Sequence, residues 1–457
     1  MNTLPVFSPN DGLPLGHIEL IAADAIDALC SKLPSAQEDF KTHTPEQRAD
    51  WLKAIAGKIK SEAETLAQLI AGEGGKPLKD ARIEVTRAAE TFELCAHEAL
   101  TNARPSEKIA LKGKQLYTFR EPIGPVLALS AFNHPLNLLA HQVGSAIAAG
   151  CVVVFKPSQS TPLCGEWLQK ILREIGVPAS AAQILHAAVP EIQQLVARPE
   201  FQFVSFIGSA KVGWDLRTRL APGTRLALEH GGQAPAIVWD DADLPQAITA
   251  LLRGAFYHAG QVCISTQKIY VHQNIWDRFC DSFVLGAKKL VVGDARDPNT
   301  DVGPLIRPAE KTRLQEWMQE ARKLGANILL EDTQERGAQY MGPTILTHVP
   351  HAAKIWREEA FGPVVCLQPF TDTESIWQEM RENPFQFEAA IFTQDPKRME
   401  DAIMNMAAMT VVVNDHTAWR VDAMPFGGHR QSGLGMGGVK YSVEEQTRLK
   451  QIVLSGS

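Results

Sequence analysis

The chain has 457 residues, more than one compact core accommodates, so we expect two or three domains. Hydrophobic residues make up 45% of the sequence and charged residues 21%, a balance that excludes disordered and fibrous proteins. The formal net charge of −7 provides no basic footprint for a nucleic acid, and no such partner is expected.

Seven cysteines occur at wide spacing and without a Cys-x-x-Cys pair, a pattern that favours neither a disulfide framework nor a metal site. The first basic residue is Lys32, so the start of the chain lacks the charged region of a signal peptide. The sequence has no run of about 18 apolar residues to span a membrane. We therefore expect reduced thiols, no metal, no membrane partner and a cytoplasmic location.

The first predicted elements are helices between residues 45 and 100. Thr44 and the Pro-Glu pair after it are typical of an N-cap, a first-turn proline and an acid that suits the helix dipole. The sequence Gly-Gly-Lys-Pro at 74–77 breaks the pattern, and another helix is expected over 81–99.

Residues 101–122 are polar and rich in turn formers, and they differ from the helices before them. We expect a β-hairpin that stands off the main body, with its turn at Lys-Gly-Lys 112–114. The end of the chain, residues 448–454, is predicted to form one more strand and is a candidate partner for this hairpin.

From residue 124 onward, apolar strands alternate with amphipathic helices. The strand at 124–129 is followed by a helix that should begin at Pro135 and end at Gly150, and Thr161-Pro162 should cap and start the next helix. Such alternation predicts a parallel sheet covered on both faces, with ligands at the carboxyl ends of its strands. Further strands are expected at 151–155, 183–187, 202–207 and 225–228, and the same alternation resumes from about 231 to 425.

Cys263 follows a Gly-Gln turn in the sequence Tyr-His-Ala-Gly-Gln-Val-Cys at 257–263. A bend of this kind exposes a thiolate and leaves a backbone N–H free to face developing negative charge. A small buried core residue is the competing interpretation. Cys263 is therefore a candidate nucleophile that requires partners.

Two polar residues at strand ends are candidate partners. Asn133 follows the strand at 124–129, where its amide is either an oxyanion donor or a turn and cap residue. Glu229 follows the strand at 225–228 and precedes a Gly-Gly bend. It is either a general base whose pKa is raised by partial burial or a surface acid at a strand end.

Two further segments after strands suggest ligand binding. Gly-Ser-Ala-Lys at 208–211 leads into a helix, and a helix N-terminus attracts an anion through its free N–H groups. Lys156 follows another strand and either binds a sugar hydroxyl or phosphate or is an ordinary exposed lysine.

Together and in this order, seven segments resemble the aldehyde dehydrogenase superfamily, and the resemblance covers essentially the whole chain. They are Phe-Asn-His-Pro (132–135), Phe-Lys-Pro-Ser (155–158), Phe-Ile-Gly-Ser-Ala-Lys-Val-Gly (206–213), Leu-Glu-His-Gly-Gly (228–232), Gly-Gln-Val-Cys (260–263), Glu-Glu-Ala-Phe-Gly-Pro-Val (358–364) and Pro-Phe-Gly-Gly (425–428).

The resemblance implies the α/β aldehyde dehydrogenase fold in three parts and a homodimer or homotetramer. A Rossmann-like NAD(P)-binding domain would comprise 1–103 and 123–231, and an α/β catalytic domain would comprise 232–425. A small β oligomerisation hairpin would comprise 104–122 and 442–457, and residues 426–441 would return to the cofactor domain.

The resemblance also implies oxidation of a small-molecule aldehyde to a carboxylic acid with NAD or NADP. Cys263 would attack the aldehyde, the Asn133 amide and the Cys263 N–H would hold the oxyanion, and Glu229 would activate water against the thioester. The cofactor-binding positions that it implies are Phe132, Lys156, Ser158, Gln159, Gly208, Ser209, Gly231, Glu359 and Phe361.

Three departures from the family pattern stand out. Gln159 takes the place of a glutamate that repels a 2′-phosphate, so both NAD and NADP stay open. The segment 186–190 contains no glycine where the family is glycine-rich, and His230 replaces the usual leucine.

The substrate tail has one candidate partner. Arg420, in a segment that would flank the substrate tunnel, is a candidate for binding an anionic tail, and pairing with Asp422 is its alternative role. His134, His258 and Trp419 are candidate pocket residues. A short acidic aldehyde of the semialdehyde type is accordingly a candidate substrate, beside aliphatic and aromatic aldehydes.

Other functions were weighed against this one. A CoA-acylating semialdehyde dehydrogenase shares the fold, but its members generally lack the carboxylate that Glu229 provides. A cofactor-free thiol hydrolase has no use for the turns at Lys156 and 206–213. A non-catalytic homologue does not need the set Asn133, Glu229 and Cys263.

Overall fold

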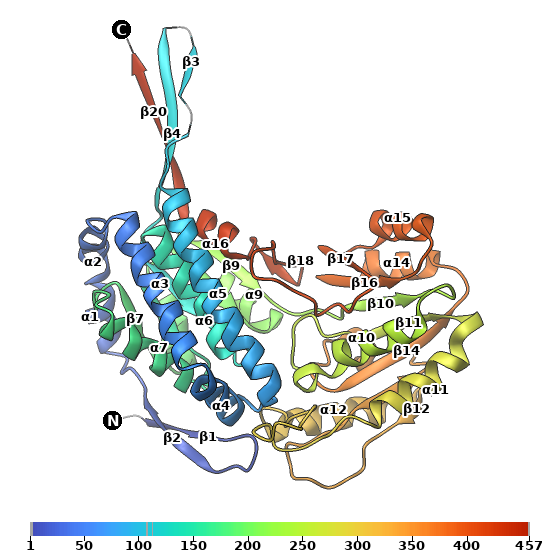
Figure 1. The fold of residues 1–457 in the computed structure, drawn as a ribbon. Coiled ribbons are helices and arrows are strands. Elements are labelled where there is room, and N and C mark those ends of the chain that lie inside the picture. The colour runs from blue at the N-terminus through green and yellow to red at the C-terminus, as the bar shows by residue number, and fades with distance from the viewer. Residues whose placement is uncertain (1–2, 107, 112, 456–457) are drawn as a thin grey trace.

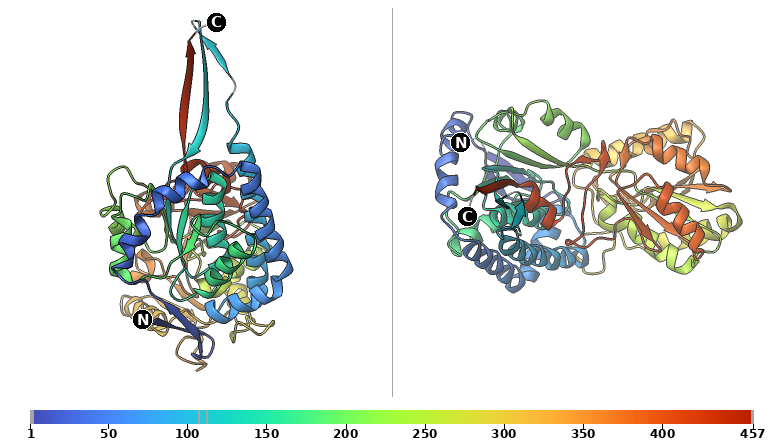
Figure 2. Two further views of the ribbon diagram at one scale, coloured as in Figure 1. Left: turned by 90° about the vertical axis from the view of Figure 1, so that its left-hand side faces the viewer. Right: turned by 90° about the horizontal axis from the view of Figure 1, so that it is seen from above.

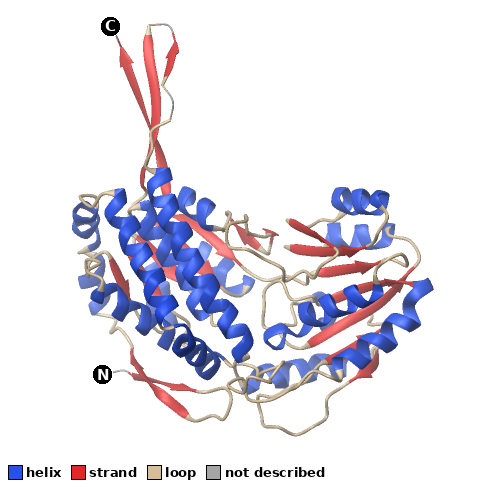
Figure 3. Cartoon of the chain, in the orientation of Figure 1, coloured by secondary structure: helices blue, strands red, loops and turns tan. Residues whose placement is uncertain are grey.

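Two layered α/β bodies and one projecting β arm make up the chain in this computed structural model (Figure 1). The structure describes residues 3–106, 108–111 and 113–455. Helices and strands alternate in both bodies (Figure 3), and the view from above separates the bodies most clearly (Figure 2). The expected α/β architecture is confirmed.

The first sheet has six strands in the order β19-β9-β8-β5-β6-β7. All pairs are parallel except the short β19, which runs antiparallel to β9. The carboxyl ends of the parallel strands therefore meet at one edge, where ligands bind in such sheets. The bounds are β5 Val126–Leu129, β6 Val153–Lys156, β7 Ala182–Ile184, β8 Phe203–Ile207, β9 Arg225–Glu229 and β19 Gly433–Leu434.

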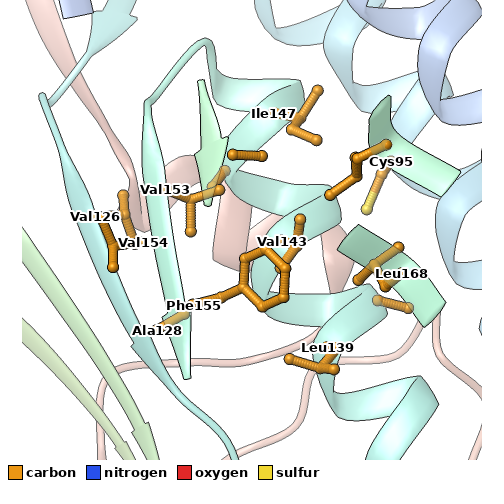
Figure 4. Packing of buried hydrophobic residues seen from close by; sticks show 14 of the residues in the cluster. Cys95, Val126, Ala128, Leu139, Val143, Ile147, Val153, Val154, Phe155 and Leu168 are labelled. Atoms are coloured by element: carbon orange, nitrogen blue, oxygen red, sulfur yellow. The ribbon is translucent and has the colours of Figure 1, made fainter. Parts of the chain in front are cut away.

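Helix α6 (Pro135–Ala149) is buried along its whole length beside this sheet. Leu139, Val143 and Ile147, spaced by four residues, pack in one cluster with Val153 and Phe155 of β6 (Figure 4). Full burial of such side chains stabilises the fold by about 1.5–3 kcal/mol each. The helix ends at Gly150, which has a φ of +82°, so its predicted limits are confirmed.

The N-terminal helices follow the predicted order with one additional break. Thr44 caps α3 (Pro45–Ser61) in a capping box with Gln47. Helix α4 (Ala63–Gly74) starts after Glu62, whose φ of −112° and ψ of 20° interrupt a segment that the sequence predicts as one helix. Helix α5 then spans Leu78–Asn102. Before them come α1 (Ala25–Cys30), α2 (Leu33–Phe40) and the hairpin of β1 (Thr3–Phe7) and β2 (Pro14–Glu19).

The predicted cap of α7 (Leu163–Glu174) is wrong. Pro162 occupies the N-cap position, and no side chain there makes a capping bond. Glu73 of α4 accepts hydrogen bonds from the backbone N–H groups of Leu163 and Cys164 instead, at 2.7 and 3.0 Å. A carboxylate distant in sequence thus satisfies the helix N-terminus. Two shorter helices follow in this body, α8 (Val189–Val196) and α9 (Ala210–Arg217).

The second sheet has seven strands in the order β12-β13-β14-β11-β10-β16-β17, and only β12 pairs antiparallel to its neighbour. Its strands are β10 Pro235–Val238, β11 Lys268–His272, β12 Asn327–Leu330, β13 Thr344–Thr347, β14 Val364–Phe370, β16 Glu388–Phe392 and β17 Thr410–Val413. Its helices are α10 Leu244–Phe256, α11 Trp276–Ala287, α12 Pro308–Lys323, α13 Lys354–Arg357, α14 Glu374–Glu382 and α15 Pro396–Asn405. Among the helices that the structure describes, none has the length and apolarity needed to cross a membrane.

The arm consists of β3 (Ile109–Leu111), β4 (Lys114–Pro122) and β20 (Thr447–Ser455), and α16 (Val439–Glu445) leads into it. Strand β20 pairs antiparallel with β4 from Thr447↔Pro122 to Ser455↔Lys114, so the predicted pairing of the tail with the hairpin is confirmed. The predicted turn at 112–114 includes Lys112, which lies outside the described residues. Figure 2 shows the arm projecting well beyond the sheets.

Candidate active site

A cavity of about 540 Å³ lies at the carboxyl ends of the strands of the first sheet and is closed by segments of the second body. Its walls combine the turn after β5 with the ends of β8 and β9 and with the segment before β11. The predicted site residues that line it are Phe132, Asn133, His134, Ser158, Gly208, Ser209, Glu229, Gly231, Cys263, Glu359, Phe361 and Arg420.

Cys263 follows a left-handed turn of the backbone. His258, Ala259 and Gly260 have φ values of 49°, 53° and 69°. A Cβ at Gly260 would lie 2.1 Å from the carbonyl oxygen of Gly362, so only glycine fits there. Gln261 fixes the end of this turn, because its side chain donates to the carbonyl of Pro304 at 3.2 Å and accepts from the N–H of Ile306 at 2.9 Å.

Asn133 lies beside the cysteine loop. It is buried in the turn between β5 and α6, and its Nδ2 donates to the carbonyl of Gln261 at 3.0 Å. The amide has a second N–H. In the described part of the chain, the backbone N–H of Cys263 has no hydrogen-bond partner. Two donors are thus available close to the thiol.

The surroundings of the Cys263 thiol are rich in carboxyl groups. Burial raises the pKa of Cys263 strongly, and Glu359, Glu388 and Glu229 add to the shift, whereas Arg420 opposes it. The thiol therefore requires loss of a proton before it attacks a carbonyl, and Arg420 is the group that favours the thiolate.

Glu229 ends β9 in a largely enclosed position, not at the surface. Burial raises the pKa of its carboxyl group, and Arg420 opposes the rise. A Cβ at Gly437 would lie 2.5 Å from Glu229 Oε1, so the carboxyl group occupies space that only glycine leaves open. A carboxyl group with a raised pKa is suited to accept a proton from water.

The other side of the cavity combines a buried carboxyl group, a helix N-terminus and two aromatic rings. A Cβ at Gly231 would lie 1.7 Å from Glu359 Oε1, and this oxygen is buried without a hydrogen-bond partner among the described residues. Burial raises the pKa of Glu359 to about 8. Ser209 is the N-cap of α9 and makes no capping bond with its side chain. The rings of Phe132 and Phe361 meet edge to face at 5.8 Å.

Lys156 and Gln159 do not line the cavity. Lys156 is buried, and its Nζ donates to the carbonyl of Pro157 at 3.1 Å. Burial lowers the pKa of Lys156 to about 8, and in the described ranges no carboxylate pairs with it. Gln159 Nε2 donates to the carbonyl of Ala187 at 3.0 Å, which holds the glycine-free segment 186–190 in place.

The structure explains His230. Its Nδ1 bonds to the carbonyl of Gln431 at 2.8 Å, and a Cβ at Gly213 would lie 2.0 Å from its Nε2. The ring also contacts Phe206 and Trp214 edge to face. His230 therefore fills the space above the glycine of α9 and supports the helix that follows the glycine turn.

The substrate side of the cavity is cationic. Arg87 of α5 lines it and forms a bidentate pair with Asp422 at 2.9 and 2.7 Å. His141 Nε2 and Asn137 Nδ2 also bond to Asp422, at 2.8 and 3.2 Å. Burial alone would raise the pKa of Asp422, but the hydrogen bonds from His141 and Arg87 hold this pKa well below its usual range.

Arg420 is only loosely attached to this cluster. Its Nη2 lies 3.9 Å from Asp422 Oδ1, and its guanidinium carbon lies 3.5 Å from the centre of the Phe426 ring. The alternative, an Arg420–Asp422 ion pair, is thus present at 3.9 Å, but Arg87 contacts the same carboxylate more closely. His134 lines the cavity and contacts the hydroxyl of Tyr257 at 3.2 Å.

Two pocket candidates do not reach the cavity. Trp419 is 46% exposed and His258 is fully buried, and neither side chain belongs to the cavity wall.

Sequence reasoning also missed two residues, Arg87 and Glu388. Neither lies in a motif; the one available signal was a charged residue within the otherwise apolar strand pattern around 388.

In the ranges that the structure describes, no group of three or more His, Cys, Asp and Glu side chains is arranged to hold a metal ion. All seven cysteines are free thiols.

Comparisons with known proteins agree over the whole chain. The sequence model of the aldehyde dehydrogenase family matches residues 1–452. The chain is 36% identical to the 3-sulfolactaldehyde dehydrogenase of Priestia megaterium, over 97% of this chain and 93% of the relative.

Two solved structures are similar. One is the glyceraldehyde-3-phosphate dehydrogenase GapN from Methanocaldococcus jannaschii with NADP, at 35% identity and TM-score 0.94, covering 99% of each chain. The other is aldehyde dehydrogenase 21 from Physcomitrella patens with the product succinate, at 33% identity and TM-score 0.95, covering 99% of this chain and 95% of that one.

Proposed function

The chain belongs to the aldehyde dehydrogenase family, and on that premise we propose that it oxidises short aldehydes that carry an anionic group at their other end. It is an NAD(P)-dependent enzyme of the non-acylating type, which converts an aldehyde to the free carboxylic acid. The observation that carries the substrate proposal is Arg420, a guanidinium in the cavity wall whose closest carboxylate contact among the described residues is at 3.9 Å.

In the proposed mechanism, the Cys263 thiolate attacks the carbonyl carbon and forms a thiohemiacetal. Its oxygen becomes an oxyanion, which the free N–H of Asn133 Nδ2 and the backbone N–H of Cys263 stabilise by hydrogen bonds. A nicotinamide held beside Phe132, Phe361 and Gly231 would supply the hydride acceptor, and loss of hydride from this carbon would leave a thioester on Cys263. Glu229 then takes a proton from water, the hydroxide attacks the thioester, and the thiolate leaves as the acid is released.

The residues on the other side of the cavity fit the cofactor, NAD or NADP. We assign Glu359 and Lys156 to ribose hydroxyls, since Glu359 Oε1 has no other described partner and Lys156 has no carboxylate beside it. Ser158 and Gln159 follow Lys156 closely in the sequence, and we assign them to the same ribose-binding part of the site. Ser209 and Gly208, at the N-terminus of α9, would hold the pyrophosphate.

Phe132, Phe361 and Gly231 flank the nicotinamide in this proposal. The two aromatic rings already contact each other, and the absence of a side chain at Gly231 leaves room beside Glu359. Gln159 is neutral and so does not repel a 2′-phosphate, which is why NADP is acceptable as well as NAD.

Charge balance in the cavity favours an anionic tail. Arg87 and Arg420 supply two guanidinium groups, whereas Asp422 is the one carboxylate bonded to them in the described structure. Burial raises the pKa of Glu229, which lowers the compensating negative charge that this carboxyl group offers. The names of three similar proteins point the same way: sulfolactaldehyde carries a sulfonate, glyceraldehyde 3-phosphate a phosphate, and succinate two carboxylates.

A panel of aldehydes tests the proposal. Succinic semialdehyde, sulfoacetaldehyde and glyceraldehyde 3-phosphate are compared with butanal and benzaldehyde, each with NAD and NADP. We expect kcat/KM to favour the anionic aldehydes, and Arg420→Gln to lower that preference by about 10- to 100-fold, since a hydrogen bond to a charged group contributes about 1.5–3 kcal/mol. Neutral aldehydes that match the anionic ones in the wild type would refute the proposal.

The remaining assignments concern architecture and location. We propose that 1–103 with 123–231 binds the cofactor, that 232–425 carries the nucleophile, and that 426–441 returns to the first body. The arm, 104–122 with 442–457, is proposed to join copies of the chain in a homodimer or homotetramer. Seven free cysteines suit the reducing cytoplasm, where we place the enzyme.

A further inference from the structure

Glu359, which carries a proposed ribose contact, lies in a loop and not in a helix or strand. The loop joins α13 to β14, and Phe361 within it has a φ of +46°, a left-handed conformation that residues with a side chain rarely adopt. A backbone of this kind persists only where surrounding contacts hold it. The position of the Glu359 carboxyl group therefore depends on groups outside the loop.

Gln267 supplies such contacts from another part of the chain. It is the residue directly before β11 and is only 4% exposed. Its Nε2 donates to the carbonyl of Glu358 at 2.8 Å and to that of Ile355 at 2.9 Å, and its Oε1 accepts from the N–H of Ala360 at 2.8 Å. The side-chain amide thus uses both of its donors and its acceptor on one short segment.

Two of these hydrogen bonds act on both sides of Glu359. The Glu358 carbonyl belongs to the peptide unit before the Cα of Glu359, and the Ala360 N–H belongs to the peptide unit after it. Each peptide unit is planar and rigid, so holding two consecutive units restricts the φ and ψ of the residue between them. Arg313 also holds Ala360, since its Nη2 donates to the Ala360 carbonyl at 2.7 Å. The direction in which the Glu359 side chain leaves the backbone is thereby fixed.

Gln267 also connects this loop to the nucleophile. It follows Cys263 by four residues, and between them the Ile264 carbonyl accepts a hydrogen bond from the Thr417 hydroxyl at 2.7 Å. The segment from Cys263 to Gln267 is therefore held independently of the loop. One short segment thus places the thiol and the proposed ribose contact at Glu359 relative to each other.

We propose that Gln267 is a positioning residue for cofactor binding, which orients the Glu359 carboxyl group toward a ribose hydroxyl, an inference that rests on the proposed function. Gln267 itself does not line the cavity, so it acts through Glu359 and not by contact with the dinucleotide. Because the loop is already held in the free enzyme, Glu359 loses little conformational freedom when the cofactor binds. Without Gln267, the ordering of the loop would oppose binding.

The experiment measures the dissociation constants of NADH and NADPH, by quenching of protein fluorescence, in the wild type, Gln267→Met, Glu359→Ala and the double variant. Methionine is close to glutamine in volume but lacks its hydrogen-bonding groups. We expect Gln267→Met to weaken binding by about tenfold and Glu359→Ala by about 10- to 100-fold, the range for a lost hydrogen bond to a charged group. Because Gln267 acts through Glu359, the double variant should bind as weakly as Glu359→Ala, within about twofold, whereas independent effects would multiply.

Two controls separate positioning from a general loss of structure. Gln37 is also 4% exposed, and its amide likewise joins two backbone groups, the carbonyl of Gly150 and the N–H of Val152, both at 2.9 Å. Gln37→Met should lower the midpoint of unfolding as Gln267→Met does, but it should leave both dissociation constants unchanged. In Gln267→Met without cofactor, the rate at which iodoacetamide alkylates Cys263 should stay within about twofold of the wild type. In the same variant KM should rise for the cofactor and not for the aldehyde.

Cofactor binding in Gln267→Met that equals the wild type overturns the proposal, and so does a double variant whose loss is the product of the two single losses. Hydrogen exchange in the wild type provides a measurement that needs no variant. Before NADPH is added, the Ala360 amide should be as strongly protected as the amides of β14. Exchange at the rate of an open loop, with protection only after NADPH is added, overturns the proposal as well.

The outcome for Glu359 separates this inference from the proposed substrate class. If Glu359→Ala binds both cofactors as the wild type does, the ribose contact and the role of Gln267 fail together. The preference for anionic aldehydes depends on Arg420 and is measured with a different set of substrates, so it stands or falls independently.

Discussion

The thiol of Cys263 has three carboxyl groups and one guanidinium as its charged neighbours. Burial and the carboxyl groups of Glu359, Glu388 and Glu229 raise its pKa, and Arg420 alone among these neighbours opposes them. Arg420 therefore has two roles in the proposed mechanism, since it favours the thiolate and binds the tail of the substrate. An anionic tail that neutralises Arg420 also weakens the effect by which Arg420 lowers the pKa of Cys263. Tighter binding of the tail therefore comes at the expense of thiolate formation.

The first prediction concerns Glu229 as the base of the second step. In Glu229→Gln we expect one equivalent of reduced cofactor in a rapid burst, followed by turnover at least about 100-fold slower than in the wild type, because water is no longer activated. Rapid-mixing absorbance of reduced cofactor measures this, and Cys263→Ser should show no burst. Since the pKa of Glu229 is raised, the base form increases with pH, so deacylation in the wild type should accelerate as the pH rises. Unimpaired steady turnover in Glu229→Gln would contradict the assignment.

The second prediction concerns Gln159 and the choice of cofactor. In Gln159→Glu the donor to the Ala187 carbonyl is lost, and the new carboxylate repels both that carbonyl oxygen and a 2′-phosphate. We expect KM for NADP to rise by about tenfold or more while KM for NAD changes by less than about threefold. Steady-state kinetics with both cofactors measure the shift. Gln183→Glu on β7 adds the same charge away from the cavity and should leave both values unchanged.

At the scale of elements, the local sequence predicted the end of a helix correctly wherever the capping group lies in the same segment. Thr44 caps α3 and Gly150 ends α6 as expected, because the necessary residues are adjacent to the helix. The start of α7 was predicted wrongly, since its acceptor is Glu73, 90 residues earlier. The break at Glu62 was missed because no glycine or proline marks it.

The third prediction concerns the left-handed turn before Cys263. Gly260→Ala should be destabilised by more than about 3 kcal/mol and should lose activity, because its Cβ would collide with the Gly362 carbonyl at 2.1 Å. Gly223→Ala is the control: Gly223 has a φ of +89° but nothing within 4 Å, so it reports the cost of the left-handed backbone alone, about 1 kcal/mol. Denaturant unfolding of both variants gives the difference, and equal losses would rule out the steric explanation.

At the scale of the whole molecule, the arm leaves apolar side chains without cover. Leu449 and Val453 lie on the same face of β20 and are exposed, as is Ile109 on β3. An exposed apolar strand at the edge of a sheet is a liability for an isolated chain, which supports the proposed role of the arm in assembly.

The fourth prediction tests that role. Leu449→Glu combined with Val453→Glu should reduce the native mass to that of a single chain, measured by sedimentation equilibrium, while the circular dichroism spectrum stays that of the wild type. Lys450→Gln, on the opposite face of β20, removes only an exposed ion pair with Glu121 and should leave the assembly intact. An unchanged mass in the double variant would exclude the arm as the assembly contact.

The sequence by itself determined the alternation of strands and helices, and it supplied the proposed catalytic residues: the amide Asn133, the base Glu229 and the nucleophile Cys263. These depend on residue type and on local turns, which the sequence displays directly. Only the tertiary structure decided what surrounds them. Arg87 on α5 lies against Asp422, 335 residues away, and Glu388 on β16 is close enough to Cys263 to raise the pKa of its thiol. Electrostatic coupling depends on distance through space and on burial, and neither can be read from separation along the chain.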